Sequence, residues 1–255
     1  MKLLLINPNT STSVSDLIRA EAQRSAAPGT QVQVLTAPFG VAYIETRFEA
    51  LIGAYAVAEL AAANHGEYDA LVVAAFGDPG LLGLREVLPC PVIGLTDAAL
   101  ASACLLGQRF SIVAISQRIR AWYGETVAQY GLSGRLASIR GLDEPLSDIG
   151  SVQGNQGERL VQLAERCVAD DGADVIVLAG APLAGLARSL RGRLPVPCVD
   201  GVSSAVRHAE TLIALQPGSA SRGSFAPPPI KPNQGLSPAL QRLLTSCASA
   251  PVPKH

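Results

Sequence analysis

Short runs of apolar residues recur along the chain, and stretches with a helical pattern separate them. The first run, residues 2–6 (KLLLI), lacks polar–apolar alternation, which is typical of a parallel strand covered on both faces. Strands that alternate with helices predict a parallel sheet with right-handed crossovers, so the predicted fold class is α/β. The expected strands lie at residues 2–6, 30–37, 69–75, 90–95, 110–116, 173–179 and 197–202. The expected helices include residues 13–26, 47–64, 118–130, 157–170 and 237–246.

Two segments of the sequence share the same pattern of elements. Residues 69–94 (DALVVAAFGDPGLLGLREVLPCPVIG) and 174–201 (DVIVLAGAPLAGLARSLRGRLPVPCVDG) share a strand, a small-residue turn, a helix rich in Leu and Arg, a proline and a second strand. Aligning the two segments places Ala75 opposite Gly180. Open α/β sheets bind ligands at the carboxyl ends of their strands. We therefore expect a ligand site between the two turns.

The repeat predicts two pseudosymmetric lobes, each a short parallel sheet flanked by helices. Lobe 1 is predicted to comprise residues 1–98 and 203–220, and lobe 2 residues 99–202. Residues 221–255 are predicted to form a Pro-rich C-terminal arm and tail, because Pro, Gly and Ser are typical of extended surface segments.

The composition narrows the classes of partner. The formal net charge is −1, and the sequence has no long charged runs. It therefore lacks the cluster of basic residues that nucleic-acid binding requires. The first apolar run is too short for a signal peptide or a membrane span, so we expect a cytoplasmic protein that does not bind membranes. No glycine-rich nucleotide motif occurs, and the scattered cysteines indicate neither a disulfide framework nor a metal site. These cysteines are Cys90, Cys104, Cys167, Cys198 and Cys247.

The two small-residue turns are expected to present main-chain N–H groups at helix N-termini, where an anion or oxyanion binds. The expected donors are Phe76, Gly77 and Asp78 in lobe 1, and Ala181 and Leu183 in lobe 2. Pro182 has no N–H, so the second turn has one donor fewer. Asp78 precedes Pro79, and this pair predicts the Ncap and N1 positions of a helix; a catalytic carboxylate is the alternative.

Several motifs resemble the hydantoin and allantoin racemases of the aspartate/glutamate racemase superfamily, along nearly the whole chain. They are INPNTS (6–11), GVAYIE (40–45), AAFGDPGLLGLRE (74–86), the VIVLAGAPLAG turn, VDGV with the AE pair at 209–210, and GSFAPPPIKPNQGL (223–236). The resemblance implies a two-lobed pseudosymmetric fold, a multimer, and inversion of a carbon between a carbonyl and a ureido nitrogen without a cofactor. It also implies two thiols, one that removes a proton and one that returns it from the opposite face, while main-chain N–H groups stabilise the enolate.

This sequence departs from that pattern at both thiol positions. The resemblance places the first family cysteine at Ala75 and the second at Gly180. Neither a methyl group nor a hydrogen accepts a proton, so two-base racemisation cannot operate through these positions. Each lost acid or base typically costs about 10²- to 10⁴-fold in rate.

Other side chains are candidates for the site. Asp200 and Asp97 follow strands and could face the cleft, with helix capping as the alternative for both. His208 lies on a predicted helix, and histidine is a residue type suited to acid–base chemistry, although a surface or core histidine is the alternative. The remaining candidates are Tyr43, Glu45, Asn9 and Thr10 for ligand binding, and Cys90 and Cys198 as distant thiols.

The sequence thus predicts a cofactor-independent enzyme that binds a small carbonyl, cyclic ureide or carboxylate compound between its lobes. The expected substrate-binding residues are Asn9, Thr10, Tyr43, Ala75, Phe76, Gly77, Gly180, Ala181 and Pro182, and the expected catalytic residues are Asp78, Asp200 and His208. Its reaction is expected to differ from two-thiol racemisation: an isomerisation, a decarboxylation or lyase step, or a cyclisation. The alternatives are a non-catalytic binding protein and a cysteine knock-out of an ordinary hydantoin racemase. A homo-oligomer is expected, and the Pro-rich arm could pack on a neighbouring subunit.

Overall fold

The computed structural model describes residues 1–143 and 149–247, which form two parallel sheets. Both sheets are four-stranded and have the same strand order, β2-β1-β3-β4 and β6-β5-β7-β8. The strands are β1 (Lys2–Asn7), β2 (Gln31–Thr36), β3 (Ala70–Val73), β4 (Val92–Gly94), β5 (Phe110–Ala114), β6 (Leu136–Gly141), β7 (Val175–Ala179) and β8 (Cys198–Asp200). The predicted α/β fold with two pseudosymmetric lobes is confirmed. We use lobe 1 for the first sheet and its helices, and lobe 2 for the second.

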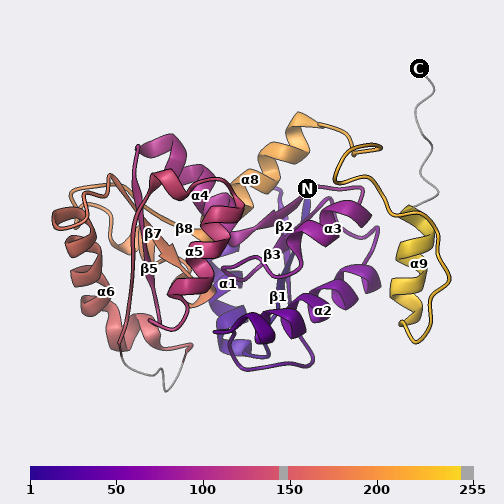
Figure 1. Cartoon of the computed structure of the whole chain (residues 1–255), viewed down its shortest axis with the longest axis horizontal. Coiled ribbons are helices and arrows are strands. Elements are labelled where there is room, and N and C mark those ends of the chain that lie inside the picture. Colours follow the sequence, from indigo (N-terminus) through magenta and orange to yellow (C-terminus); the bar gives the residue numbers. More distant parts are fainter. Residues whose placement is uncertain (144–148, 248–255) are drawn as a thin grey trace.

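Helices connect the strands and cover both faces of each sheet (Figure 1). The α-helices are α1 (Thr12–Ser25), α2 (Arg47–Ala63), α3 (Leu81–Val87), α4 (Leu95–Leu106), α5 (Arg120–Gln129), α6 (Val152–Ala169), α7 (Leu186–Ser189), α8 (Gly201–Leu215) and α9 (Pro238–Cys247). Two short 3₁₀ helices are η1 (Ser133–Arg135) and η2 (Ala181–Leu183). Within the described residues, no helix is long and apolar enough to cross a membrane.

The continuous apolar run in β1 is explained by burial on both faces. Successive side chains of a strand point to opposite faces of its sheet. Leu3 and Leu5 accordingly belong to one core cluster with residues of α1 and α8, whereas Leu4 and Ile6 belong to another with residues of α2, α3 and α9. Every residue of β1 after Lys2 is buried, and the side chains are apolar up to Asn7, the last residue of the strand.

The repeat is visible in matching hydrogen bonds at the start of each sheet. The main-chain N–H of Lys2 donates to the carboxylate of Asp69 over 2.7 Å. In lobe 2, the N–H of Arg109 donates to the carboxylate of Asp174 over 2.8 Å. These contacts anchor β1 to β3 and β5 to β7 in the same way, and the two aspartates occupy equivalent positions in the alignment of the two segments.

The helices that follow β4 and β8 each pack on the opposite lobe. Helix α4 follows lobe 1 in sequence but contacts β7 and β8, while α8 follows lobe 2 but contacts β3 and β4. The two helices lie against each other between the sheets (Figure 1). The predicted division at residues 98 and 99 falls inside α4, and the predicted return of residues 203–220 to lobe 1 covers most of α8.

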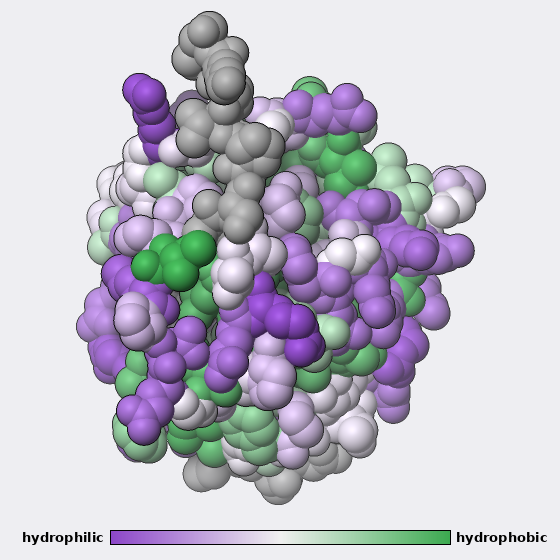
Figure 2. All heavy atoms as spheres, turned by 90° about the vertical axis from the view of Figure 1, so that its right-hand side faces the viewer, coloured by the Kyte–Doolittle hydropathy of each residue, from purple (hydrophilic) through white to green (hydrophobic). Residues whose placement is uncertain are grey.

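Residues 216–237 contain no helix or strand and lead from α8 to α9, which packs on α2 and α3. Leu243 of α9 is buried in the lobe 1 core, and the Ser237 hydroxyl donates to Glu59 of α2 over 2.6 Å. On the visible part of this side of the molecule, apolar residues form small separate patches among hydrophilic ones (Figure 2). The expected packing of the arm on another subunit stays a prediction.

Candidate functional site

The loops after β3 and β7, which we call tip 1 (residues 74–80) and tip 2 (residues 180–185), each reach into the opposite lobe. Phe76 of tip 1 lies in the core cluster of lobe 2, with its ring 4.7 Å from the ring of Tyr123. Ala181 of tip 2 lies in the core cluster of lobe 1, together with Ala74. This exchange brings both tips to the junction of the lobes, at the carboxyl ends of the central strands.

Tip 1 is a tight turn that depends on Gly77. The N–H of Asp78 donates to the carbonyl of Ala75 over 3.2 Å, and Gly77 has a φ of 94°. A Cβ at Gly77 would collide with the ring of Trp122, so only glycine fits. The N–H of Gly77 donates to Thr96 Oγ1 over 2.6 Å. The expectation that Gly77 and Asp78 offer N–H groups to a ligand is therefore wrong, because both are already bonded.

Asp78 caps a helix, but not the one predicted. Helix α3 starts after Gly80, whose φ is 82°, so Asp78 and Pro79 are not its Ncap and N1 residues. The carboxylate of Asp78 instead accepts the N–H groups of Thr96 and Asp97, each over 2.9 Å, at the start of α4. It also accepts the hydroxyl of Tyr130 over 2.6 Å. Asp78 thus joins tip 1 to the N-terminus of the inter-lobe helix and to lobe 2.

Asp200 likewise caps α8, although its position in lobe 2 does not correspond to that of Asp78 in lobe 1. It is the N-cap residue of α8 and accepts the N–H of Ser203 over 2.9 Å. By strand register, Asp200 corresponds to Gly94 in lobe 1. A Cβ at Gly94 would collide with the carboxyl group of Asp78, so the Asp78 carboxylate takes the place that a side chain at position 94 would fill. Each inter-lobe helix therefore has one buried carboxylate at its N-terminus, where the helix dipole favours negative charge.

Asp78 gives the stability a definite pH dependence. Burial raises its pKa from an ordinary 3.8 to about 6, against the opposing effect of its three hydrogen bonds. The folded chain therefore binds this proton more tightly than the unfolded chain, and the free energy of unfolding falls as pH rises from about 4 through about 6. We expect this group to contribute a fall of about 3 kcal/mol. Denaturant unfolding between pH 4 and pH 7 should show a smaller fall for Asp78→Asn than for the wild type; equal slopes would contradict the assignment.

Tip 2 is built on Gly180, which has a φ of 111°. A Cβ there would lie 3.5 Å from Cδ of Pro182 and 4.0 Å from Ile115, which is ordinary contact. Space is thus present for a side chain, but the backbone conformation disfavours any residue other than glycine. The N–H of Leu183 donates to the carbonyl of Gly180 over 3.0 Å, so the expected donor role of Leu183 is also wrong.

One buried N–H group on each tip is left without a partner. In the part of the chain that the structure describes, the main-chain N–H groups of Phe76 and Ala181 make no hydrogen bond, although only 3% and 4% of these residues is exposed. Buried N–H groups are almost always paired with protein or bound water. The Phe76 donor lies in a turn rather than at a helix N-terminus as expected, and the Ala181 donor begins η2. Both suit an acceptor atom between the tips.

The loop after β1 adds a third donor. Asn9 is 6% exposed, and its Oδ1 accepts Asn7 Nδ2 and the N–H of Ser11, each over 2.9 Å. These bonds fix the amide orientation and leave Asn9 Nδ2 with no partner among the residues described. Capping of α1, the alternative role for Asn9 and Thr10, belongs to Ser11, which accepts the N–H of Val14. The N–H of Thr10 donates to the carbonyl of Val41, which ties this loop to the one that carries Tyr43.

The loop between β2 and α2 carries the candidates Tyr43 and Glu45. The hydroxyl of Tyr43 donates to Glu45 Oε2 over 3.2 Å, and burial together with Glu45 raises the pKa of Tyr43. At the start of α2, Arg47 forms an exposed ion pair with Glu125 of α5, which links lobe 1 to lobe 2 beside tip 1.

The remaining candidates lie in other contacts. His208 lies two turns along α8 and is 3.1 Å from the hydroxyl of Ser102 on α4. Asp97 forms an ion pair with Arg85. Burial raises the pKa of Cys90 to about 11 and that of Cys198 to about 12, so both remain thiols near neutral pH and are poor bases. The described residues contain no cluster of ligating side chains that could hold a metal ion.

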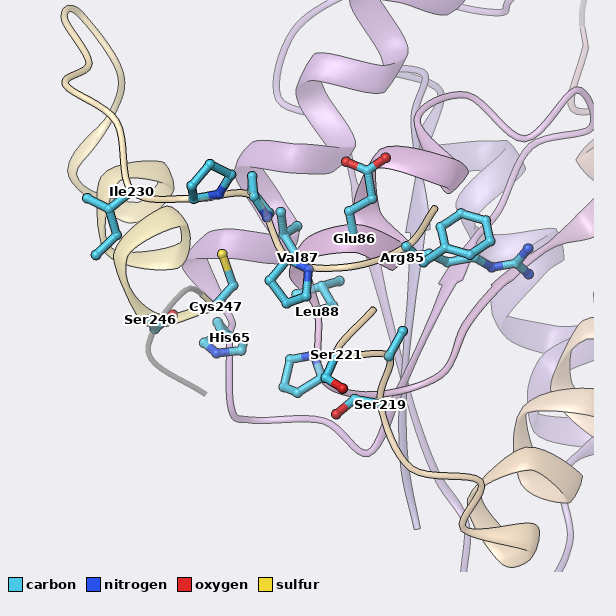
Figure 3. Close-up of a pocket in the computed structure, with 16 residues that line it drawn as sticks. His65, Arg85, Glu86, Val87, Leu88, Ser219, Ser221, Ile230, Ser246 and Cys247 are labelled. Carbon is cyan, nitrogen blue, oxygen red and sulfur yellow. The ribbon is translucent and has the colours of Figure 1, made fainter. Parts of the chain in front are cut away.

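A cavity of about 650 Å³ lies at the C-terminal end of α3, under residues 219–230 (Figure 3). Val87 and Leu88 at the end of α3, His65 after α2, and Cys247 at the end of α9 line it. Helices that follow parallel strands run back toward the amino ends of those strands, so the ends of α2 and α3 mark the edge of the sheet opposite the tips. Because open α/β sheets bind ligands at the carboxyl edge, we place the site at the tips.

These features define a two-lobed α/β protein with a candidate ligand site at the junction of two pseudosymmetric sheets. The family model described as Asp/Glu/Hydantoin racemase matches residues 3–209, and the chain belongs to this family. This confirms the resemblance drawn from the sequence motifs.

Individual relatives agree with this assignment. The chain is 37% identical to a hydantoin racemase of Paenarthrobacter aurescens over 235 residues, which covers 89% of this chain and 98% of the relative. An allantoin racemase structure from Klebsiella pneumoniae superimposes with a TM-score of 0.89 at 36% identity, covering 94% of this chain and 98% of that one. Arylmalonate decarboxylase superimposes with a TM-score of 0.61 at 15% identity, over 88% of this chain and 97% of the other, which shows a shared fold only.

Proposed function

We propose that this chain is a cofactor-independent enzyme that binds a small carbonyl, cyclic ureide or carboxylate compound between tips 1 and 2. The observation that supports this most strongly is the pair of buried N–H groups without a hydrogen bond among the residues described, Phe76 on tip 1 and Ala181 on tip 2. Donors fixed by the backbone stabilise the oxygen of an enolate without reorganising, which is the largest single effect in many enzymes. The unpaired Nδ2 of Asn9 adds a third donor for an acceptor atom of the ligand.

The reaction we propose is not two-base racemisation. Ala75 and Gly180 stand where the resemblance places the family thiols, and neither side chain moves a proton. Asp78 and Asp200 cap helices, which leaves them no role as free bases. Chemistry that reaches an enolate without removing a proton fits this site better. In a decarboxylation, for example, the carbon–carbon bond breaks, CO₂ leaves and the electron pair moves onto the carbonyl oxygen; the enolate carbon then takes a proton from solvent water.

A non-catalytic binding protein is the second candidate, favoured by the commitment of the Asp78 and Asp200 carboxylates to helix capping. A knock-out of an ordinary racemase is disfavoured by Gly180, because its φ of 111° differs from what a cysteine at that position adopts without strain.

Calorimetry and proton NMR in heavy water test the proposal together. We expect 5-methylhydantoin or methylmalonate to bind, and the hydantoin to show no deuterium exchange at its α-carbon above the rate without protein. Loss of CO₂ from methylmalonate would support the enzyme over the binder. Rapid α-carbon exchange would contradict the proposed loss of proton chemistry, and binding of neither compound would contradict the proposed site.

A further inference from the structure

Tyr123 lies at the junction of the lobes, next to tip 1. It belongs to α5 of lobe 2 and is only 3% exposed. Its ring contacts the ring of Phe76 with an interplanar angle of 53°, and the N–H of Phe76 is one of the two buried tip donors without a partner. The ring of Tyr123 therefore forms part of the wall against which tip 1 is fixed.

The hydroxyl of Tyr123 differs from every other tyrosine hydroxyl in the chain. Of the five tyrosines, four donate a hydrogen bond to a carboxylate or a carbonyl: Tyr43, Tyr55, Tyr68 and Tyr130. Tyr123 is more buried than these, yet its hydroxyl has no partner among the residues described. A buried tyrosine hydroxyl normally finds a partner, because an unpaired one loses its bonds to water without compensation.

The unpaired hydroxyl is not sealed inside the core. Within the described residues, Arg188 Nε is the one fully enclosed side-chain polar atom that lacks a partner. The oxygen of Tyr123 therefore still touches solvent-accessible space, although the rest of the residue is packed in protein.

Two carboxylates act electrostatically on this hydroxyl, Asp78 of tip 1 and Glu45 of the loop before α2. Burial and these two charges raise the pKa of Tyr123. The phenol therefore stays protonated at neutral pH and acts as a hydrogen-bond donor rather than as a base.

We propose that Tyr123 is a ligand-binding residue that donates its hydroxyl to a carbonyl or carboxylate oxygen of the molecule bound at tip 1. With the N–H of Phe76 it gives this side of the site two donors, one from each lobe. The assignment rests on the proposed function, because it requires a ligand with acceptor oxygens between the tips. It also explains why a buried hydroxyl is kept where phenylalanine would fill the same space.

Tyr123→Phe tests the assignment, and Tyr130→Phe is the matched control. The probes are 5-methylhydantoin, which is neutral, and methylmalonate, which is charged. By calorimetry we expect Tyr123→Phe to weaken hydantoin binding about 5-fold and methylmalonate binding about 30-fold, because hydrogen bonds to charged groups are stronger. The midpoint of thermal unfolding should stay unchanged in Tyr123→Phe, since no bond within the protein is lost. Tyr130→Phe should instead lower the midpoint by about 2–4 °C and leave binding nearly unchanged.

The outcomes separate this inference from the proposed function. If the wild type binds the probes and Tyr123→Phe binds them equally well, the role of Tyr123 is overturned while the proposed site stands. If Tyr123→Phe lowers the unfolding midpoint as much as Tyr130→Phe does, its hydroxyl has a protein partner and the inference is overturned. If the wild type binds neither probe, the proposed function fails and this inference fails with it.

Discussion

Ala75→Cys is expected to raise the rate of deuterium incorporation at the α-carbon of 5-methylhydantoin about 10²- to 10⁴-fold over the unsubstituted protein. A single thiolate at tip 1 would remove the proton from one face of the bound ring only. Exchange should therefore occur in one enantiomer, with the product retaining its configuration. Proton NMR in heavy water measures the exchange, and chiral chromatography measures the configuration.

The backbone explains why this substitution is the one to make first. Within the described residues, Asp78 and Gln216 are the non-glycine residues with a positive φ, so Ala75 has a conformation that cysteine adopts freely. Gly180 has a φ of 111°, and a cysteine there would be strained even though no atom blocks its Cβ. We therefore expect Gly180→Cys alone to give much weaker exchange.

Two further variants test whether Ala75→Cys restores proton removal by a thiolate. Ala75→Ser has nearly the same size as Ala75→Cys but its hydroxyl is a far weaker acid, so it should give no exchange above the unsubstituted protein. Ala75→Cys combined with Gly180→Cys should add inversion only if tip 2 rearranges to relieve its strain. If Ala75→Cys binds the hydantoin but shows no deuterium exchange, position 75 does not face the α-carbon.

The strand pattern is predictable from the sequence because it depends on burial alone. Central strands such as β5 and β7 are covered on both faces, and their apolar runs identify them without any knowledge of the fold. The edge strand β6 (LASIRG) is absent from the expected strands, since most of its residues are only half-buried and no continuous apolar run results. Helix α4 is absent from the expected helices because it follows β4 directly, with Gly94 as both the last strand residue and the N-cap.

The site is predictable only in part, because its decisive contacts join distant residues. The cap of α4 comes from Asp78, 18 positions before Thr96, and no local pattern reveals such a contact. Asp200 caps the helix that begins next to it, and this role is among those expected from the sequence. The sequence gives no indication of Thr96 and Tyr123, because a threonine in a first helical turn and a tyrosine inside a helix have no pattern that marks a site.

Gly94→Ala is expected to destabilise the protein by about 3–5 kcal/mol, although it adds a single methyl group. Its Cβ would collide with all three carboxyl atoms of Asp78. The carboxylate would have to move, and the N–H groups of Thr96 and Asp97 would lose their acceptor. Gly83→Ala is the matched control: it lies inside α3 with no atom within 4 Å of its Cβ, and it should stabilise by about 0.5–1 kcal/mol. Denaturant unfolding measures both.

A double variant shows whether the collision with Asp78 causes the loss. Asp78→Gly combined with Gly94→Asp would give α4 an N-cap of the kind that Asp200 gives α8, and glycine at position 78 tolerates the positive φ found there. The carboxylate introduced at position 94 would accept the helical N–H groups from its own strand end, and the space vacated at position 78 would remove the collision. We expect the double variant to be about 2 kcal/mol more stable than Gly94→Ala, short of the wild type because Tyr130 loses its acceptor. If the double variant is instead no more stable than Gly94→Ala, the two carboxylates are not equivalent caps, and the pseudosymmetry of the lobes does not extend to their inter-lobe helices.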